Sequence, residues 1–121
     1  MPRQLINIVQ LKAGVGDARS VGNETTGVPA DDHYWFYAAG DVLLVRNSDA
    51  ANPHTVDVHA VNDAQGRNPL PSGKSTRAVP ASSFVAFDLG SGEGWIQTGA
   101  DAGRVHVDVD DASLRLQVLR R

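Results

Sequence analysis

Short runs in the second half of the chain alternate apolar and polar residues. In residues 55–61, 104–110 and 114–119 the apolar positions fall on every second residue: Val56, Val58, Ala60; Val105, Val107, Val109; and Leu114, Leu116, Val118. Successive side chains of a β-strand point to opposite faces, so this period of two predicts strands with one buried face. Residues 42–45 are apolar at every position, which predicts a central strand covered on both faces.

Other segments complete an all-β pattern. Residues 83–89 and 95–98 are further candidate strands, and residues 5–11 are compatible with a strand or a helix. Stretches rich in Gly, Pro, Asn and Ser at 62–75 and 90–94 predict turns and surface excursions between them. The expected fold is an antiparallel β-sandwich, immunoglobulin-like or jelly-roll-like, with a long N-terminal arm or loop.

The N-terminal part differs in composition. Residues 13–32 are mostly Gly, Ala, Ser, Thr, Asn and Asp, and such a segment buries too little apolar surface to offset its ordering entropy. We therefore predict an extended arm or long loop there. The expected division is residues 1–32 as an N-terminal strand plus flexible arm, and residues 33–121 as the sandwich domain.

A block of consecutive aromatic residues is the candidate interaction site. Residues 34–37 hold four of the seven aromatic side chains, with Tyr34 and Phe36 on one parity and Trp35 and Tyr37 on the other. One pair is expected in the core and the other at an interface, because aromatic side chains provide large, rigid contact area. Parity alone leaves open which pair does which. The predicted interface comprises Tyr34, Trp35, Phe36, Tyr37 and the arm valines Val15, Val21 and Val28.

Composition narrows the classes of function. With 121 residues the chain fits one domain, and without cysteine it has no disulfide or thiolate metal site. A net charge of -3 gives no general reason to bind nucleic acid or an anionic membrane. No apolar run approaches the roughly 20 residues of a membrane span, and the N-terminus lacks a signal-peptide layout. We expect a soluble, unexported protein.

Two histidine–aspartate pairs and one aspartate run are the candidates for metal binding. Asp57 with His59 and His106 with Asp108 lie on outward parities, and pairing of their strands would gather ligands suitable for zinc. A solvated polar face explains the same pattern and is preferred. The run through Asp110 and Asp111 suggests calcium but lacks the loop of an EF-hand, so a turn is preferred there too. We predict no metal and no cofactor.

Two segments resemble phosphate-binding motifs, but each matches only in part. The glycine-rich stretch 90–94 precedes an apparent strand rather than the helix that a phosphate loop needs, and residues 73–75 match only the end of a Walker A motif. No Gly-x-Ser-x-Gly elbow is present. We predict no catalytic residues and no enzymatic activity.

The order of these pieces resembles a family of bacteriophage capsid decoration proteins, also called head cement or auxiliary capsid proteins. The resemblance rests on the aromatic strand, the Gly-Asp-Val-Leu-Leu-Val-Arg-Asn run at 40–47, and the segment 53–58. It continues through the turn at 79–81 into 84–87, the strand at 103–107 and the terminal run at 116–120. It covers roughly residues 33 to 121 and consists of strand and turn patterns rather than a signature motif.

The resemblance implies a structural virion protein that binds the outer surface of a phage head and bridges shell subunits. The implied partner is the major capsid protein, and a homo-oligomer is expected, with a trimer as one form. Synthesis would occur in the host cytoplasm, and the segment 13–32 would order on docking. Two alternatives stay open: a phage tail or neck protein, and a carbohydrate- or cell-surface-binding sandwich in which Trp35, Tyr37 or Trp95 stacks on sugar rings.

Overall fold

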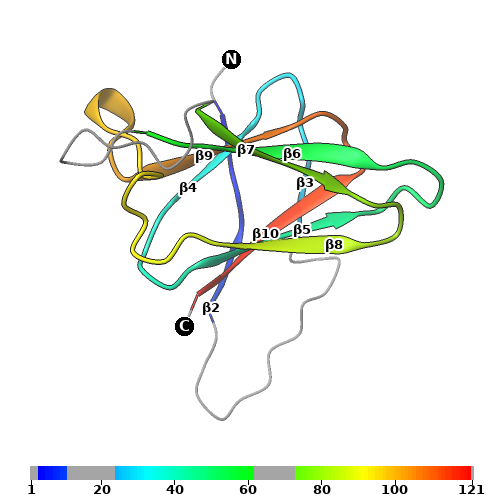
Figure 1. The fold of residues 1–121 in the computed structure, drawn as a ribbon, viewed down its shortest axis with the longest axis horizontal. Helices are drawn as coiled ribbons and strands as arrows, with labels where there is room; N and C mark the ends of the chain where they lie inside the picture. The colour runs from blue at the N-terminus through cyan, green and yellow to red at the C-terminus, as the bar shows by residue number, and fades with distance from the viewer. Residues whose placement is uncertain (1–2, 11–23, 62–72, 121) are drawn as a thin grey trace, which may run out of the picture.

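Two β-sheets face each other in the computed structural model, which describes residues 3–10, 24–61 and 73–120 (Figure 1). Sheet A has the strand order β1-β4-β9-β6-β7. Its strands are β1 (Gln4–Leu5), β4 (His33–Phe36), β9 (Arg104–Val109), β6 (His54–His59) and β7 (Lys74–Val79). Sheet B has the order β2-β10-β5-β8, and β3 also pairs with β10. Its strands are β2 (Ile8–Gln10), β10 (Leu114–Arg120), β5 (Val42–Asn47), β8 (Phe84–Asp88) and β3 (Thr25–Thr26).

The all-β sandwich-like prediction is confirmed, but the sheets are mixed rather than purely antiparallel. β1 pairs in parallel with β4, and β2 pairs in parallel with β10. The other strand pairs are antiparallel. Both parallel pairs involve the N-terminal segment, so the exception comes from one stretch of chain.

The core lies between the sheets and follows the predicted alternation. Val56, Val58, Val105 and Val107 are fully buried from sheet A, and they face the buried side chains Leu43, Val45, Leu114, Leu116 and Val118 from sheet B. β5 lies between β10 and β8, as predicted for a central strand, and Leu44 on its outer face is only 8% exposed. Local periodicity thus identified these inward residues correctly, whereas Ala60, also predicted inward, lies beyond the end of β6 and is only half-buried.

The N-terminal segment 5–11 was expected to form one strand or a helix, and its described part belongs to two short strands in different sheets. β1 joins sheet A and β2 joins sheet B, with Ile6 between them at 1% exposure. The Ile6 N–H donates to the Tyr34 carbonyl at 2.9 Å, and the Val118 N–H donates to the Asn7 carbonyl at 2.9 Å. The segment therefore crosses from one sheet to the other and closes one side of the sandwich.

The predicted arm is corrected in its C-terminal part. Residues 24–32 pack onto the sandwich, because β3 pairs with β10 and the Glu24 carboxylate accepts two hydrogen bonds from Arg46, each 2.8 Å long. The Val28 N–H also donates to Nε2 of the buried His33 at 2.9 Å. Of the arm valines, Val15 and Val21 lie outside the described residues.

The candidate strand at 95–98 is a series of turns. Gly92 and Gly94 adopt positive φ angles of 85° and 90°, a region that side chains with a Cβ rarely occupy. The Trp95 N–H donates to the Gly92 carbonyl at 2.9 Å, which closes a tight turn where the pattern suggested extended chain. A short 3-10 helix follows over Gly99–Asp101.

Candidate interaction surface

β4 divides the aromatic block between the core and the surface. Trp35 is fully buried, and its Nε1–H donates to Asp41 Oδ2 at 3.1 Å. Tyr37 packs against the core from the same side. Tyr34 and Phe36 point outward, and Phe36 is 51% exposed. Trp35 therefore cannot belong to the predicted interface, because no part of it reaches the surface.

Tyr34 and Phe36 form an exposed cluster together with Leu5 and Arg104. We call these four residues the aromatic patch. The Tyr34 and Phe36 rings meet edge to face with centroids 5.7 Å apart. The Arg104 guanidinium lies 4.3 Å from the Tyr34 centroid and 5.3 Å from that of Phe36. Leu5 stands opposite Tyr34 in the register and is 53% exposed.

The patch has the chemistry of a protein contact. Aromatic residues and arginine are enriched at protein interfaces, and an arginine over an aromatic face is held in place before a partner arrives. Two exposed apolar side chains beside it add surface that gains free energy when covered. Arg104 and Leu5 were not among the residues predicted from the sequence. Only the pairing of β1 and β9 with β4 brings them there.

Farther along the same outer face, the two predicted histidine–aspartate pairs do come together. β6 and β9 are neighbours with Asp57 opposite Asp108, and the His59 and His106 rings lie 6.0 Å apart. His59 Nε2 is 2.6 Å from one Asp108 carboxylate oxygen, and Arg3 donates to the other at 2.6 Å. Burial opposes ionisation of Asp108, but these two hydrogen bonds outweigh it and hold its pKa well below the ordinary value.

This cluster is built as an ion-pair network. Both oxygens of Asp108 are occupied, and the Lys74 ammonium lies 3.9 Å from one of them. Burial lowers the pKa of His106, and the nearby Arg3 charge lowers it further, which favours a neutral ring. Within residues 3–10, 24–61 and 73–120, no group of three or more His, Asp or Glu side chains is arranged to hold a metal ion. The network ties Arg3, ahead of β1, to β6 and β9.

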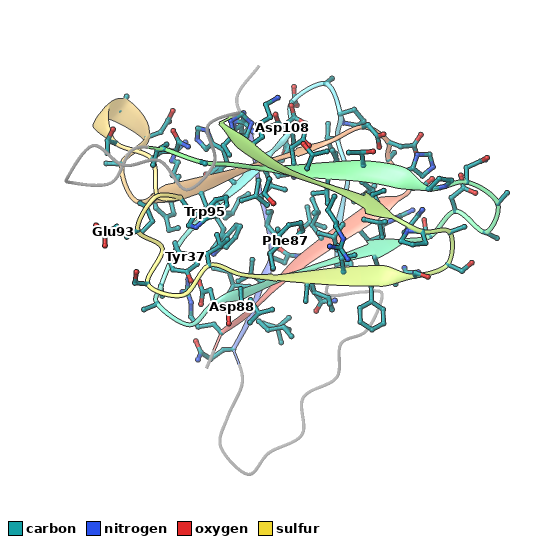
Figure 2. All side chains as sticks on the ribbon, in the orientation of Figure 1. Tyr37, Phe87, Asp88, Glu93, Trp95 and Asp108 are labelled. Atoms are coloured by element: carbon teal, nitrogen blue, oxygen red, sulfur yellow. The ribbon has the colours of Figure 1, made fainter. Side chains whose placement is uncertain are left out.

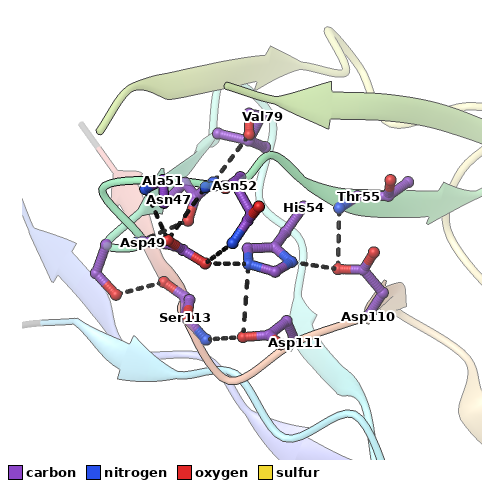
Figure 3. A network of polar contacts seen from close by, with 11 residues as sticks. Asn47, Asp49, Ala51, Asn52, His54, Thr55, Val79, Asp110, Asp111 and Ser113 are labelled. Atoms are coloured by element: carbon purple, nitrogen blue, oxygen red, sulfur yellow. Dashed lines mark hydrogen bonds and ion pairs between the residues drawn. The ribbon is translucent and has the colours of Figure 1, made fainter. Parts of the chain in front are cut away.

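A second polar network joins two loops at one end of the sandwich (Figure 3). Asp49 accepts hydrogen bonds from the Ala51 and Asn52 N–H groups at 2.8 and 3.2 Å, and its other oxygen lies 2.9 Å from His54 Nε2. The backbone bond from Ala51 and the contact with His54 lower the pKa of Asp49 to about 2, and the same contact raises the pKa of His54.

The two aspartates considered for calcium serve this end of the fold as turn residues. Asp110 accepts from the Thr55 N–H at 2.9 Å, and Asp111 accepts from the Ser113 N–H at 2.8 Å. Each carboxylate also lies 3.8 Å from a His54 ring nitrogen. The preferred turn interpretation agrees with this geometry.

A third site, which the sequence did not reveal, is the buried carboxylate of Asp41. It is 1% exposed and accepts hydrogen bonds from Trp35 Nε1, the Ala38 N–H and the Arg120 guanidinium at 2.9–3.1 Å. Burial alone would raise its pKa, but the bonds from Arg120, Ala38 and Trp35 outweigh that effect and lower it. We call this arrangement the Asp41 clamp, because it joins β4 of sheet A to β10 of sheet B.

The two glycine segments considered for phosphate binding lead into other structures. Gly73 is followed directly by strand β7, and residues 90–96 form consecutive turns, so neither segment opens directly into an α-helix. Among the described residues, no helix has the length and apolar character needed to cross a membrane.

The chain was compared with protein-family models, with curated proteins and with solved structures. None of the three comparisons returns a match.

Proposed function

We propose that this chain is a structural virion protein that decorates the outer surface of a phage head and stabilises it by bridging shell subunits. The partner is the major capsid protein, and the working form is a homo-oligomer, with a trimer as one form. Within this proposal the sandwich is of the immunoglobulin-like or jelly-roll-like kind. The sequence resemblance over residues 33 to 121 motivates the role.

The observation that carries the proposal is the aromatic patch on the outer face of sheet A. A module that reinforces a shell needs a rigid contact surface rather than chemistry. Leu5 and Phe36 leave about half of their surface exposed, and Arg104 is already seated against Tyr34 and Phe36. Little side-chain entropy remains to be lost on docking, which favours tight contact.

Repetition over a symmetric shell would amplify this contact. Each patch buries a modest area, but copies linked within an oligomer bind with a raised effective concentration. Many weak contacts then reinforce the shell without any one of them being strong. This mechanism requires a copy number that scales with the shell protein.

The first experiment is quantitative mass spectrometry of purified virus particles against the major shell protein. A ratio near one, or a simple fraction of it, supports the decoration role. A handful of copies per particle would assign the protein to the tail or neck, and complete absence would overturn the virion role.

A matched pair of variants then tests the patch itself. Phe36→Ser removes the exposed ring from sheet A, and Phe84→Ser removes a 60% exposed ring from the outer face of sheet B. We expect Phe36→Ser to weaken rebinding to shells stripped of this protein by about tenfold, the loss of one interface anchor, and Phe84→Ser to have little effect. Equal binding by both variants would exclude the aromatic patch as the contact.

The carbohydrate-binding alternative requires an exposed aromatic side chain that can stack on a sugar ring, and its three candidates are largely covered. Trp35 is buried, and Tyr37 and Trp95 are partly buried against the core (Figure 2). A shift in tryptophan fluorescence on addition of a glycan would support carbohydrate binding.

A further inference from the structure

The side of the sandwich formed by β7 and β8 is open. β7 pairs only with β6, and β8 pairs only with β5, within the part of the chain that the structure describes. A groove of about 490 Å³ runs between the two edges, lined by Ser75, Thr76, Arg77 and residues 84–88. Figure 2 shows Phe87 in the space between these strands.

The backbone of β8 presents to this groove a regular set of N–H and C=O groups that have no strand partner among the described residues. The Asn47 N–H donates to the Ser83 carbonyl at 2.8 Å, which identifies that pair as hydrogen-bonded in the antiparallel β5–β8 ladder. Such ladders alternate, so Val85 and Phe87 bond to β5. The N–H and C=O groups of Phe84, Ala86 and Asp88 therefore point toward the open edge.

β8 also lacks the usual protection of an edge strand. Exposed edges commonly carry lysine, proline or inward-pointing charges that prevent another strand from adding. Residues 84–87 of β8 are Phe-Val-Ala-Phe, without charge or proline. These four positions of β8 therefore carry none of the features that protect an edge strand.

The inner face of the groove adds a charge requirement. Arg77 is opposite Val56, whose side chain is fully buried, so Arg77 stands on the core-facing side of β7. It is nevertheless exposed, and no acidic side chain among the described residues pairs with it. Across the groove, Val85 and Phe87 on the inner side of β8 are half-buried against the core.

A second copy of this edge does not satisfy these groups. The inward side chains of β8 are Val85 and Phe87, and its only carboxylate, Asp88, has outward parity and already accepts the Gly90 N–H at 2.9 Å. Twofold pairing of the open sides would also bring the two Arg77 side chains toward each other. The complementary occupant is therefore a different strand with a carboxylate on its inner side.

We propose that the β7–β8 groove binds an extended acidic segment of another protein, which adds to β8 as a strand. Its backbone bonds to Phe84, Ala86 and Asp88, its inner apolar side chains cover Val85 and Phe87, and its inner carboxylate pairs with Arg77. This mode of recognition takes affinity from main-chain hydrogen bonds and specificity from alternate side chains. The inference holds whether or not the proposed virion role stands.

The probe is a short blocked peptide, Thr-Val-Thr-Glu-Thr-Val-Thr, which places valine and glutamate on one face. Backbone NMR of the full chain is recorded with increasing peptide up to millimolar concentration. We expect amide exchange of Phe84, Ala86 and Asp88 to slow, while Val85 and Phe87, already bonded to β5, change little. The matched peptide with lysine in place of glutamate is expected to bind about fivefold more weakly.

Two variants complete the test. Ala86→Pro removes an N–H that points to the open edge, so the β5–β8 ladder stays intact and peptide binding is lost. If this variant fails to fold, Arg77→Glu provides the answer, because it should reverse the preference in favour of the lysine peptide.

Strand addition is overturned if the amides of Phe84, Ala86 and Asp88 keep exchanging fast at millimolar peptide. Equal binding of both peptides overturns the role of Arg77, and concentration-dependent protection in the protein alone would assign the edge to a second copy.

Discussion

One side of this sandwich is covered by the chain and the opposite side ends in two edge strands, β7 and β8. On one side the N-terminal segment contributes β1 to sheet A and β2 to sheet B, with Ile6 buried between them. On the other side β7 and β8 end their sheets without a cover among the described residues. One side is therefore sealed by the N-terminal segment, and the other ends in open strand edges within the part of the chain that the structure describes.

The contrast between the two sides suggests separate places for stability and for recognition in this β-sandwich. The closed side also holds the Asp41 clamp, which links β4 and β10, the strands next to the N-terminal segment. The open side keeps half-buried apolar side chains and Arg77, which has no acidic partner among the residues that the structure describes. We therefore expect substitutions on the closed side to cost stability and those on the open side to change binding.

The largest effect is expected from breaking the Asp41 clamp. Asp41→Ala leaves the Trp35 N–H and the Arg120 guanidinium without their acceptor, and should lower the free energy of unfolding by about 4 kcal/mol. Urea unfolding followed by tryptophan fluorescence measures the change. The control is Asp88→Ala at the open side, where one hydrogen bond to the Gly90 N–H is lost and we expect about 1 kcal/mol. Similar losses in both variants would contradict the difference between the sides.

A second pair of substitutions removes apolar side-chain volume, one on the closed side and one on the open side. Ile6→Ala cuts a 1% exposed side chain from the crossover and should cost about 3 kcal/mol, whereas Val85→Ala trims a half-buried side chain and should cost about 1 kcal/mol. Thermal unfolding of the two variants gives both values under one condition. The comparison fails if Val85→Ala is the more destabilising substitution.

The smallest effect concerns pH and the network at the end of the sandwich. Because Asp49 raises the pKa of His54 above 6.5, the stability that His54 contributes is fully present below pH 6.5 and is lost as pH rises through the raised value. Melting temperatures measured across this range should fall slightly with rising pH. His54→Gln should flatten that dependence, and an unchanged slope in this variant would assign it to another group.

Part of the fold could be predicted because strand alternation is a local property. Val56, Val58, Val105 and Val107 were placed inward from parity alone, and β5 was recognised as a central strand. The predictions failed where glycine geometry or long-range pairing decides. Gly92 and Gly94 turned an apparent strand at 95–98 into turns, and the apolar run near the N-terminus was divided between two sheets.

The candidate site was predicted only in part, for the same reason. Tyr34 and Phe36 were named from the aromatic block, but parity left open whether they or Trp35 and Tyr37 face outward. Arg104 reached the patch through the pairing of β9 with β4. The β7–β8 groove had no sequence signal, since it depends on which strand ends each sheet.

The all-β class, most inward residues and the aromatic block can be recognised from local patterns, because side-chain parity along a strand depends only on neighbouring residues. Long-range packing sets which strands are neighbours, which edge is sealed and which is open, and which charges find partners. Those outcomes depend on contacts between segments far apart in the chain. Arg3 with Asp108 and Arg120 with Asp41 are examples that no local pattern encodes.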